Sequence, residues 1–318
     1  MTRVAIVTDA GGWHVRELQR ALRERGATGR SVDLADCRVD TLQGRHGIVL
    51  PGFGGALPDA ALVRGIAGGS FEQVTLRLGV LHALAALGVP VYNEARAIER
   101  SVDKAMTSLL LHAAGLPAPT TWAMESLAVA QRLVTRESAA GRSLVVKPLF
   151  GSQGKGIERV GWVEGRHVGL PAAGAAGDLA GAPYGGVAYL QRFVEPLARP
   201  GHDWRVLVVG GRAVAAMRRV SEHWVHNVAR GARCVPEPLD HGAGPTLARL
   251  AEAAARALEM DYAGVDLIPT PDGPQILEVN GVAAWRGLQR VTSIDLARAI
   301  VDDLLDGKCA RLARQQLA

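Results

Sequence analysis

The stretch LVVKPLFGSQGKGI at positions 144–157 constrains the fold more than any other part of the sequence. Its apolar start is typical of a buried strand, which delivers Lys147 into a glycine-rich loop with a second lysine, Lys155. Glycine lets backbone N–H groups approach anionic oxygens, and lysine adds a compact positive charge, so the pattern favours a polyphosphate site. It matches neither the Walker P-loop nor the G-x-G-x-x-G spacing. Taken alone, it is equally compatible with an ordinary surface hairpin.

The N-terminal part of the chain alternates short apolar runs with amphipathic helical patterns, which predicts a mostly parallel sheet. Strands are expected at 3–8, around 30–34 and at 47–51, and the helical pattern after the first strand ends at Gly26. The loop PGFGG at 51–55 would then lie at the carboxyl edge of the third strand, where open α/β sheets bind ligands. A dinucleotide site is the alternative, but its glycine fingerprint is missing.

Two helices and a short strand are expected before the glycine-rich loop. Residues 69–87 have the apolar spacing of an amphipathic helix, and residues 89–93 predict a strand that ends the first domain. The next helix is expected to begin after Ser101 as its N-cap and to end at Gly115. Lys104 then lies in its first turn, where the helix dipole disfavours a cation unless an anion is nearby.

The second half of the chain predicts further strands and two helices. Between Gly161 and Gly186 the sequence is rich in glycine and alanine without clear periodicity, so we expect a poorly packed connection that contains a weak helix. A strand is expected at 187–196, and residues 203–220 predict a hairpin that turns at Gly210–Gly211. The helices are expected at 248–258 and 295–305.

The last predicted hairpin places three oxygen-bearing side chains together. Asp266 lies in GVDLI, and Glu278 and Asn280 lie in LEVN, two residues apart and therefore on one face of the sheet. A suitable register brings Asp266 beside them. Two carboxylates and an amide oxygen in an apolar hairpin repel each other unless a cation lies between them, and all-oxygen ligands suit Mg²⁺. The alternative is a solvated acidic edge.

Length and charge limit the classes of protein that fit. At 318 residues the chain is long for one core and predicts two or three domains. The net charge is +5 and the pI is about 9.4, but the basic residues are spread along the chain and aromatic residues make up 4%. We therefore expect no nucleic-acid partner, and the positive excess suits an anionic small ligand.

The apolar runs, the N-terminus and the cysteines of the sequence indicate the cellular compartment. No apolar run reaches the roughly 18 residues that span a bilayer, so no membrane contact is expected. The N-terminus MTRVAIVTDAGG lacks the long apolar segment of a signal peptide. Cys37, Cys234 and Cys309 are far apart and odd in number, which suggests neither a disulfide framework nor a zinc site. We expect a cytoplasmic protein.

Six segments occur in the order found in ATP-grasp ligases: SVDKAMTSLLL, the GSQGKG loop after Lys147, YLQRFVE, DWRVLVVG, NVARGA and the pair AGVDL with LEVNG. Over about residues 60–305 the sequence resembles the RimK-like branch of carboxylate–amine ligases. This branch includes α-L-glutamate ligases and enzymes that extend an amino-group carrier protein. The tail VNGVAAWRGLQ is similar to a subgroup linked to tetrahydromethanopterin and C1 metabolism.

The resemblance implies an α/β (α+β) architecture with the ATP-grasp fold. An N-terminal pre-ATP-grasp domain with a parallel sheet would occupy residues 1–98. A central subdomain at 99–190 would carry the glycine-rich lid, and a C-terminal subdomain at 191–318 would carry the metal-binding hairpin. These two α+β units would clamp the nucleotide between them.

The resemblance also implies a nucleotide site. Two lysines would contact the phosphates, the 151–156 loop would close over the β- and γ-phosphates, and residues 191–194 would hold the adenine. The metal hairpin would bind two Mg²⁺ ions, with Mn²⁺ as an alternative, through Asp266, Glu278 and Asn280. The implied nucleotide ligands are Lys104, Lys147, Gly151, Ser152, Gln153, Gly154, Lys155, Gly156, Gln191, Arg192, Phe193, Val194 and Asp203.

Catalytic and substrate roles follow from the same resemblance. Arg219 would stabilise the transferred phosphoryl group and the acyl-phosphate, with Arg205 and Lys147 as further catalytic residues. Asn227 and Arg230 would face the substrate carboxylate. Where a basic residue often stands two positions before that asparagine, this chain has a valine, which leaves the acceptor open. Contacts of the substrate with His223, His226, Trp285 and Arg286 are also left open.

The implied activity is an ATP- and Mg²⁺-dependent ligase that forms an amide or peptide bond through an acyl-phosphate. It would add L-glutamate or another amino acid to a small-molecule or carrier acceptor, with a tetrahydromethanopterin-type cofactor as one candidate. The partners would be small carboxylate and amine substrates, and the protein would be a homo-oligomer, either a dimer or a tetramer. The alternatives are a small-molecule kinase on the same fold and a nucleotide-binding regulator without turnover.

Overall fold

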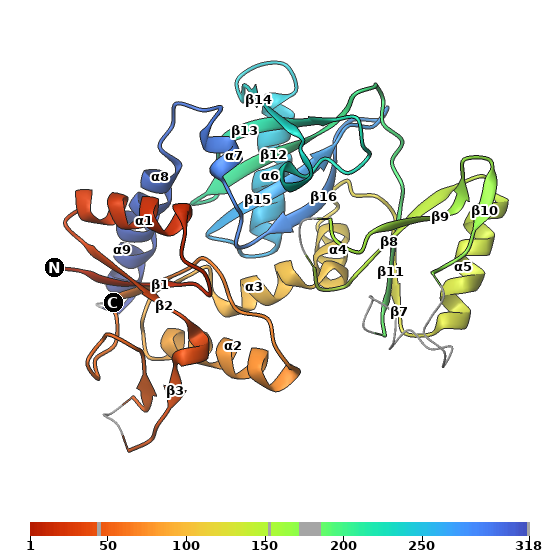
Figure 1. The fold of residues 1–318 in the computed structure, drawn as a ribbon. Coiled ribbons are helices and arrows are strands. Elements are labelled where there is room, and N and C mark those ends of the chain that lie inside the picture. The colour runs from red at the N-terminus through yellow and green to blue at the C-terminus, as the bar shows by residue number, and fades with distance from the viewer. Residues whose placement is uncertain (43–45, 152–153, 172–185, 317–318) are drawn as a thin grey trace.

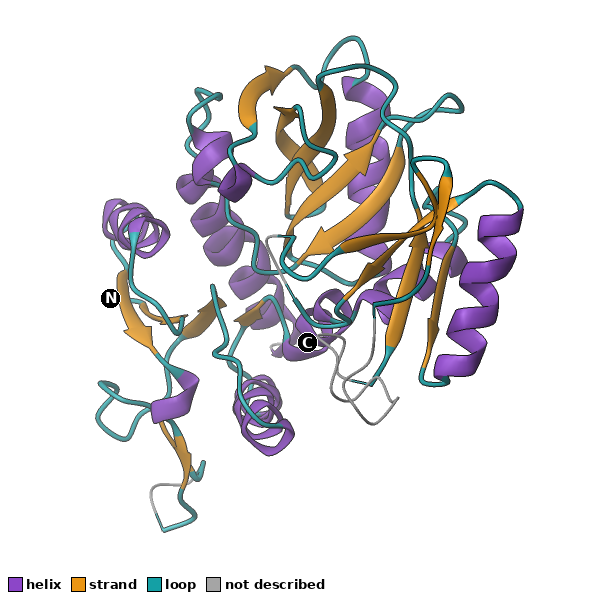
Figure 2. Ribbon diagram, turned by 45° about the vertical axis from the view of Figure 1, so that its right-hand side comes forward, coloured by secondary structure: helices purple, strands orange, loops and turns teal. Residues whose placement is uncertain are grey.

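The computed structural model of the protein describes residues 1–42, 46–151, 154–171 and 186–316. Figures 1 and 2 show the N-terminal sheet at one end of the molecule, the central sheet at the other end and the C-terminal sheet between them. No helix in these ranges is long and apolar enough to cross a membrane. The predicted loop residues Ser152 and Gln153 lie outside the described residues.

The N-terminal sheet is parallel, as predicted, with the strand order β2-β1-β5-β6. Its two faces carry different helices because successive side chains of β1 point to opposite sides. Val4 and Ile6 share a core with α1, and Ala5 and Val7 share a core with α2. The elements are β1 (Arg3–Val7), α1 (Trp13–Glu24), β2 (Thr28–Val32), β5 (Ala60–Val63), α2 (Phe71–Ala86) and β6 (Val91–Tyr92).

The third strand of this sheet was predicted in the wrong place. Strand β4 (Ile48–Val49) pairs antiparallel with β3 (Arg38–Val39), outside the parallel sheet and next to a 3₁₀ turn at Leu34–Asp36. The position beside β1 belongs to β5, whose four small apolar residues are fully buried. The loop at 51–55 therefore does not follow a strand of the parallel sheet. Arg64 and Gly65 follow β5 instead.

The helix predicted after Ser101 corresponds to α4 (Lys104–Ala113), and a separate helix, α3 (Ala95–Val102), precedes it. Asp103 caps α4, because its carboxylate accepts hydrogen bonds from the backbone N–H groups of the second and third helical residues. Ser101 is therefore not the N-cap. It lies inside α3, where its hydroxyl donates to the carbonyl of Ile98. Lys104 is the first residue of α4, as its predicted place in the first turn requires.

The central sheet is antiparallel with the order β10-β9-β8-β11-β7. Helix α5 packs on it through a small apolar core. The expected poorly packed connection is wrong at its start, because β9 continues past Gly161 and turns into β10; residues 172–185 lie outside the described residues. The elements are β7 (Thr121–Met124), α5 (Leu127–Ala139), β8 (Ser143–Lys147), β9 (Glu158–Val163), β10 (Arg166–Val168) and β11 (Ala188–Arg192).

The C-terminal sheet is also antiparallel, with the order β14-β13-β12-β15-β16. The predicted turn at Gly210–Gly211 is confirmed, and both glycines have positive φ angles, of 58° and 79°, as such tight hairpins require. Helix α6 covers one face. The elements are β12 (Gly201–Val209), β13 (Arg212–Ser221), a 3₁₀ turn (Val228–Arg230), β14 (Arg233–Glu237), α6 (Gly244–Ala257), β15 (Tyr262–Ile268) and β16 (Gln275–Asn280).

The C-terminal helices return to the N-terminal part of the chain, and Figure 1 shows α8 beside α1, with which it shares a core. Asn93 fixes this junction from a fully buried position. Its amide donates to the carbonyls of Tyr262 and Gly281, each at 2.7 Å, and accepts from two backbone N–H groups. The division at residues 98 and 190 stays a prediction. The last elements are α7 (Arg286–Gln289), α8 (Leu296–Asp302), a π-helical turn (Asp303–Cys309) and α9 (Ala310–Gln316).

Candidate active site

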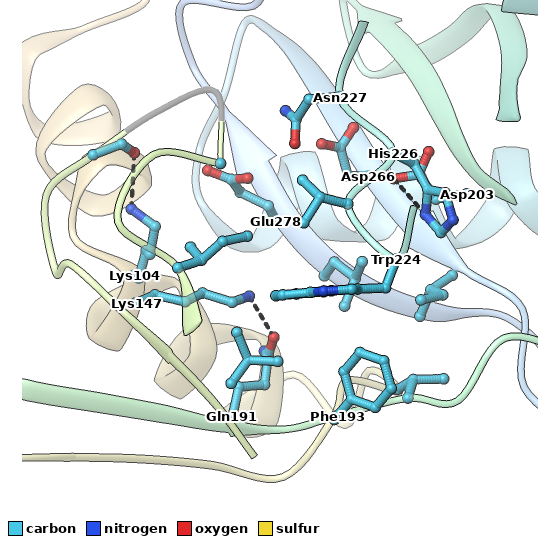
Figure 3. A pocket seen from close by; sticks show the side chains of 18 of the residues that line it. Lys104, Lys147, Gln191, Phe193, Asp203, Trp224, His226, Asn227, Asp266 and Glu278 are labelled. Atoms are coloured by element: carbon cyan, nitrogen blue, oxygen red, sulfur yellow. Dashed lines mark hydrogen bonds and ion pairs between the residues drawn. The ribbon is translucent and has the colours of Figure 1, made fainter. Parts of the chain in front are cut away.

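A cavity of about 140 Å³ lies where the central sheet meets the C-terminal sheet (Figure 3). Side chains reach it from β8 and β11 on one side and from β12, β13, β15 and β16 on the other. Helix α4, the loop after β8, the segment after β11 and the loop after β13 supply the rest. The predicted residues that line it are Lys104, Lys147, Gly151, Gly154, Lys155, Gln191, Arg192, Phe193, Val194, Asp203, Arg219, Asn227, Asp266 and Glu278.

The other described residues of the predicted site do not line this cavity: they are Gly156, Arg205, Arg230 and Asn280. Two of them still touch residues that do. Arg205 contacts Asp266, and the guanidinium of Arg230 donates to the carbonyl of Gly154 at 2.7 Å. Asn280 lies opposite Gly264 across the last hairpin, and its amide donates to that residue's carbonyl at 3.2 Å.

The two predicted lysines come together from different elements. Lys147 ends β8, and its ammonium donates to the side-chain oxygen of Gln191 at 2.7 Å. Lys104 begins α4 and donates to the carbonyls of Leu149 and Gly151, at 3.2 and 2.9 Å. Burial lowers the pKa of Lys147 to about 8, helped by Lys104 and opposed by Glu278. Burial also lowers the pKa of Lys104. Two lysines this close together and short of solvent favour a polyanionic ligand.

The predicted hinge runs along the floor of the cavity. Gln191 is buried and bridges Lys147 to the hydroxyl of Thr121. The Arg192 side chain donates to the buried Glu137 on α5, whose pKa falls to about 2 chiefly because Arg142 also donates to it. This ion pair ties the hinge to α5, so the side chain of Arg192 anchors the segment from behind.

Two aromatic side chains, Phe193 and Trp224, also line the cavity. The ring of Phe193 lies under the guanidinium of Arg159 at 3.8 Å and meets the indole of Trp224 edge-on at 5.6 Å. Figure 3 shows Trp224 within the cavity, beyond the end of Lys147. Sequence analysis missed Trp224, which follows β13 in a loop without periodicity. Its position three residues before Asn227 was the available signal.

Charged side chains from adjacent strands meet on the other side of the cavity. Arg219 on β13 faces Asp203 on β12 and donates to it at 2.7 and 2.5 Å. The same guanidinium reaches Asp266 on β15 at 3.0 Å, and Arg205 pairs with that carboxylate as well. Asp203, Arg219 and Asp266 are only 4–5% exposed. These groups lie together because the register sets Arg205 opposite Asp266 and Arg219 opposite Asp203.

The pKa values of the two aspartates move in opposite directions. Burial raises the pKa of Asp203 to about 6, although Arg219 opposes the change. Burial acts on Asp266 in the same direction, but Arg205 and Arg219 together hold the pKa of Asp266 below its usual value. The arginines therefore oppose burial at both carboxylates, and they outweigh it at Asp266, which two of them contact.

The donor set at the last hairpin fits Mg²⁺. Asp266 and Glu278 face each other across β15 and β16, as the sequence predicts. In the described part of the chain no three His, Cys, Asp or Glu side chains are grouped to hold a metal ion. Mg²⁺ commonly takes one or two carboxylates and completes its shell with water and substrate phosphates, so two facing carboxylates beside paired lysines suit it.

The structure shows where three of the residues lie whose contact with the substrate the sequence left open. His226 is buried and lines the cavity, with a ring nitrogen 3.9 Å from Asp203; burial and Arg219 lower the pKa of His226 to about 4. His223 is exposed outside the cavity lining. Trp285 is 1% exposed and packs against Trp13, His14 and Arg64, so it serves the junction with the N-terminal sheet.

Comparison with known proteins agrees with this geometry. The RimK pre-ATP-grasp domain matches residues 2–98, and the RimK-like ATP-grasp domain matches residues 180–304. The tetrahydromethanopterin:alpha-L-glutamate ligase of Methanosarcina acetivorans is 32% identical over 339 residues, which cover 96% of this chain and 99% of that protein. The probable alpha-L-glutamate ligase 2 of Hahella chejuensis is 32% identical over 312 residues, covering 91% and 92%. This chain belongs to the RimK-like ATP-grasp ligase family.

Solved structures share the fold of this ligase. The ATP-grasp ligase PsnB with its minimal precursor has a TM-score of 0.70 at 22% identity, over 96% of this chain and 99% of that one. The RimK domain protein from Sphaerobacter thermophilus has a TM-score of 0.64 at 21% identity, over 96% and 100%. The predicted α/β (α+β) ATP-grasp fold with an N-terminal parallel sheet is confirmed. The protein is an ATP-dependent ligase that forms C–N bonds.

Proposed function

We propose that this ligase joins the amino group of L-glutamate to a carboxylate of a small-molecule or carrier acceptor, with a tetrahydromethanopterin-type cofactor as the first candidate. The observation that carries the proposal is the meeting of two lysines with the facing pair Asp266 and Glu278 in one cavity. The similarity to the Methanosarcina acetivorans enzyme along nearly its whole length supports the choice of substrates.

The chemistry would proceed in two steps. The acceptor carboxylate would attack the γ-phosphorus of ATP, which forms an acyl-phosphate and releases ADP. The amine nitrogen would then attack the acyl carbon, and the C–O bond to phosphate would break, giving an amide, inorganic phosphate and a proton. Both steps gather negative charge, which preorganised cations in a site with little water stabilise well.

The side chains take roles that their positions allow. Lys104, Lys147 and the backbone of the 151–156 loop would bind the phosphates, and residues 191–194 with Asp203 would hold the rest of the nucleotide. Arg219 would stabilise the transferred phosphoryl group, with Arg205 behind it.

The metal and substrate ligands complete the proposal. Asp266, Glu278 and Asn280 would hold two Mg²⁺ ions, or Mn²⁺ in their place, and such ions neutralise phosphate charge. A structure of PsnB, described as complexed with minimal precursor, Mg and ADP, supports this choice. Asn227 and Arg230 would lie on the acceptor side. The protein would be cytoplasmic and would form a homo-oligomer, either a dimer or a tetramer.

Product analysis tests this function. The purified protein is incubated with Mg-ATP, L-glutamate and a tetrahydromethanopterin-type acceptor, and ADP, phosphate and product mass are measured. A product heavier by one glutamyl residue, formed with one ADP for each bond, is the expected result. A phosphate ester as the final product would favour the small-molecule kinase instead. Nucleotide binding without ADP release across a panel of acids and amines would favour the regulator.

A further inference from the structure

One hydrogen bond joins the loop that follows β13 to the glycine-rich loop. Arg230 ends the short 3₁₀ turn after that strand, and its guanidinium donates to the carbonyl of Gly154 at 2.7 Å, across 76 positions of the chain. Arg230 is exposed and does not line the cavity, whereas Gly154 does. The arginine therefore approaches the phosphate-binding backbone from outside.

The same glycine lies against two other residues of the acceptor loop, which we define as residues 222–230. A Cβ atom at position 154 would lie 2.9 Å from a methyl carbon of Val225 and 3.0 Å from the side-chain oxygen of Asn227. Real Cβ atoms do not approach a neighbour at the first distance, so the two loops meet this closely because residue 154 is glycine. Its φ of +67° also favours glycine.

We propose that Arg230 is a positioning residue that fixes the backbone of Gly154 against the acceptor loop. This inference rests on the proposed function. The hydrogen bond then holds Asn227 at a fixed distance from the backbone of Gly154. This fixed geometry would align the acceptor with the phosphates of the nucleotide. Lys104 holds the other described end of the glycine-rich loop through the carbonyls of Leu149 and Gly151. Arg230 thus acts on nucleotide binding before any acceptor is present.

This role differs from that of a ligand to the substrate carboxylate. A substrate ligand affects the KM of the acidic substrate and leaves the binding of Mg-ADP alone unchanged. A positioning residue weakens Mg-ADP binding even without other substrates. A single donor to a backbone carbonyl can be replaced by lysine, whereas a bidentate fork around a carboxylate cannot.

The first experiment measures the Kd of Mg-ADP by calorimetry, without amino acid or acceptor. Arg230→Ala is expected to weaken binding by about tenfold, the size of one hydrogen bond from a charged donor. Arg230→Lys is expected to recover most of the loss. An unchanged Kd in Arg230→Ala, with a raised KM for the acidic substrate alone, would overturn the inference and leave a substrate ligand in its place.

The second experiment is a double-mutant cycle between Arg230→Ala and Gly154→Ala, again on the Kd of Mg-ADP. The strain of alanine at a positive φ enters the single and the double variant alike and cancels. Gly165→Ala is the matched control, because Gly165 has a φ of +78° and open space around its Cβ position. The effects of Arg230→Ala and Gly154→Ala are expected to be less than additive, and those of Arg230→Ala and Gly165→Ala additive.

Additivity in both cycles would show that the contact with Gly154 carries no positioning role. The proposed function fails separately: if the wild-type protein binds Mg-ADP but forms no amide with any acid and amine, the ligase substrates are wrong while the binding cycles still decide on Arg230. Loss of Mg-ADP binding in the wild type would overturn both.

Discussion

Glu278 faces Asp266 directly across β15 and β16, yet the two carboxylates have different neighbours. Arg205 and Arg219 both contact Asp266. The charge of Glu278 acts instead on Lys104 and Lys147, where it opposes the lowering of both lysine pKa values by burial. Glu278 is therefore the main counter-charge on the lysine side of the cavity, whereas Asp266, which acts more weakly on Lys147, pairs with the two arginines.

Removing the charge of Glu278 tests this division. Glu278→Gln keeps the size of the side chain and removes one proposed metal ligand together with the anion that supports both lysines. We expect kcat to fall by at least about 10²-fold, in the range seen when one preorganised electrostatic group is lost. ADP release measures the effect, and thermal unfolding should show an unchanged fold. Near-normal turnover would remove Glu278 from the proposed metal site.

The buried pair of Asp203 and Arg219 predicts a stability effect. Arg219→Ala leaves Asp203 and Asp266 buried with less compensation, and breaking such a pair costs about 3–5 kcal/mol. The neighbouring Arg218 is the matched control, because its guanidinium pairs with Glu237 and is 43% exposed. Arg218→Ala should cost about 1 kcal/mol or less. Urea unfolding measures both variants, and equal costs would contradict the assigned burial of the first pair.

Many residues of this site can be predicted from the spacing of apolar and polar residues in the sequence. The contacts that cannot be predicted in this way depend on the pairing of strands that are far apart in the chain. The sequence places Lys147 at a strand end because a buried apolar run precedes it, and it places Glu278 and Asn280 on one face by their spacing. It does not reveal that Arg219 reaches Asp266, because this requires the order β13-β12-β15. That order pairs Arg205 with Asp266, 61 positions away along the chain, through a strand pairing that no local pattern encodes.

The wrong predictions about the fold also arise where contacts between elements override the local sequence pattern. The run Ala60–Val63 has no alternation and few β-branched residues, so only its pairing between β1 and β6 makes it a strand. The preceding run at 47–51 has the stronger local β pattern, but it pairs with β3 instead. Asp103, not Ser101, is the cap because α3 ends at Val102 and α4 begins at Lys104, which leaves Asp103 as the single residue between the two helices.

The contact of His14 on α1 with the start of α7 predicts that the stability of the protein depends on pH. His14 accepts hydrogen bonds from the backbone N–H groups of Trp285 and Arg286, which requires a neutral ring nitrogen. Burial, with the charges of Arg64 and Arg286, lowers the pKa of His14 from 6.5 to about 4. The unfolded chain therefore binds this proton first, so the contribution of His14 to stability is complete above pH 6.5 and declines as the pH falls towards 4.

Replacement of His14 isolates this effect. The side-chain oxygen of glutamine can accept the same N–H groups without titrating. Between pH 7 and pH 4.5 the urea midpoint of the wild type should fall more than that of His14→Gln. His82→Gln is a suitable comparison, because His82 is half-exposed on α2 and pairs with Glu99. Parallel pH curves for the wild type and His14→Gln would exclude His14 as the titrating group.

Trp224 predicts an optical signal for nucleotide binding. Its indole lies in a cavity of about 140 Å³, which is well below the roughly 300–1,000 Å³ of sites that enclose a small molecule. A nucleotide that enters this cavity must therefore move the indole or stack on it, and either event changes the surroundings of the ring. We expect Mg-ADP to change the tryptophan emission of the wild type, and Trp224→Phe to remove most of that change.

A tryptophan outside the cavity provides the control. Trp162 lies on β9, is 43% exposed and does not line the cavity. Trp162→Phe should keep the Mg-ADP signal, with an apparent Kd equal to that of the wild type. A signal that survives in Trp224→Phe and disappears in Trp162→Phe would mean that the nucleotide acts on β9 instead. The indole of Trp224 would then be a fixed wall, and the cavity would have to widen by separation of the two sheets.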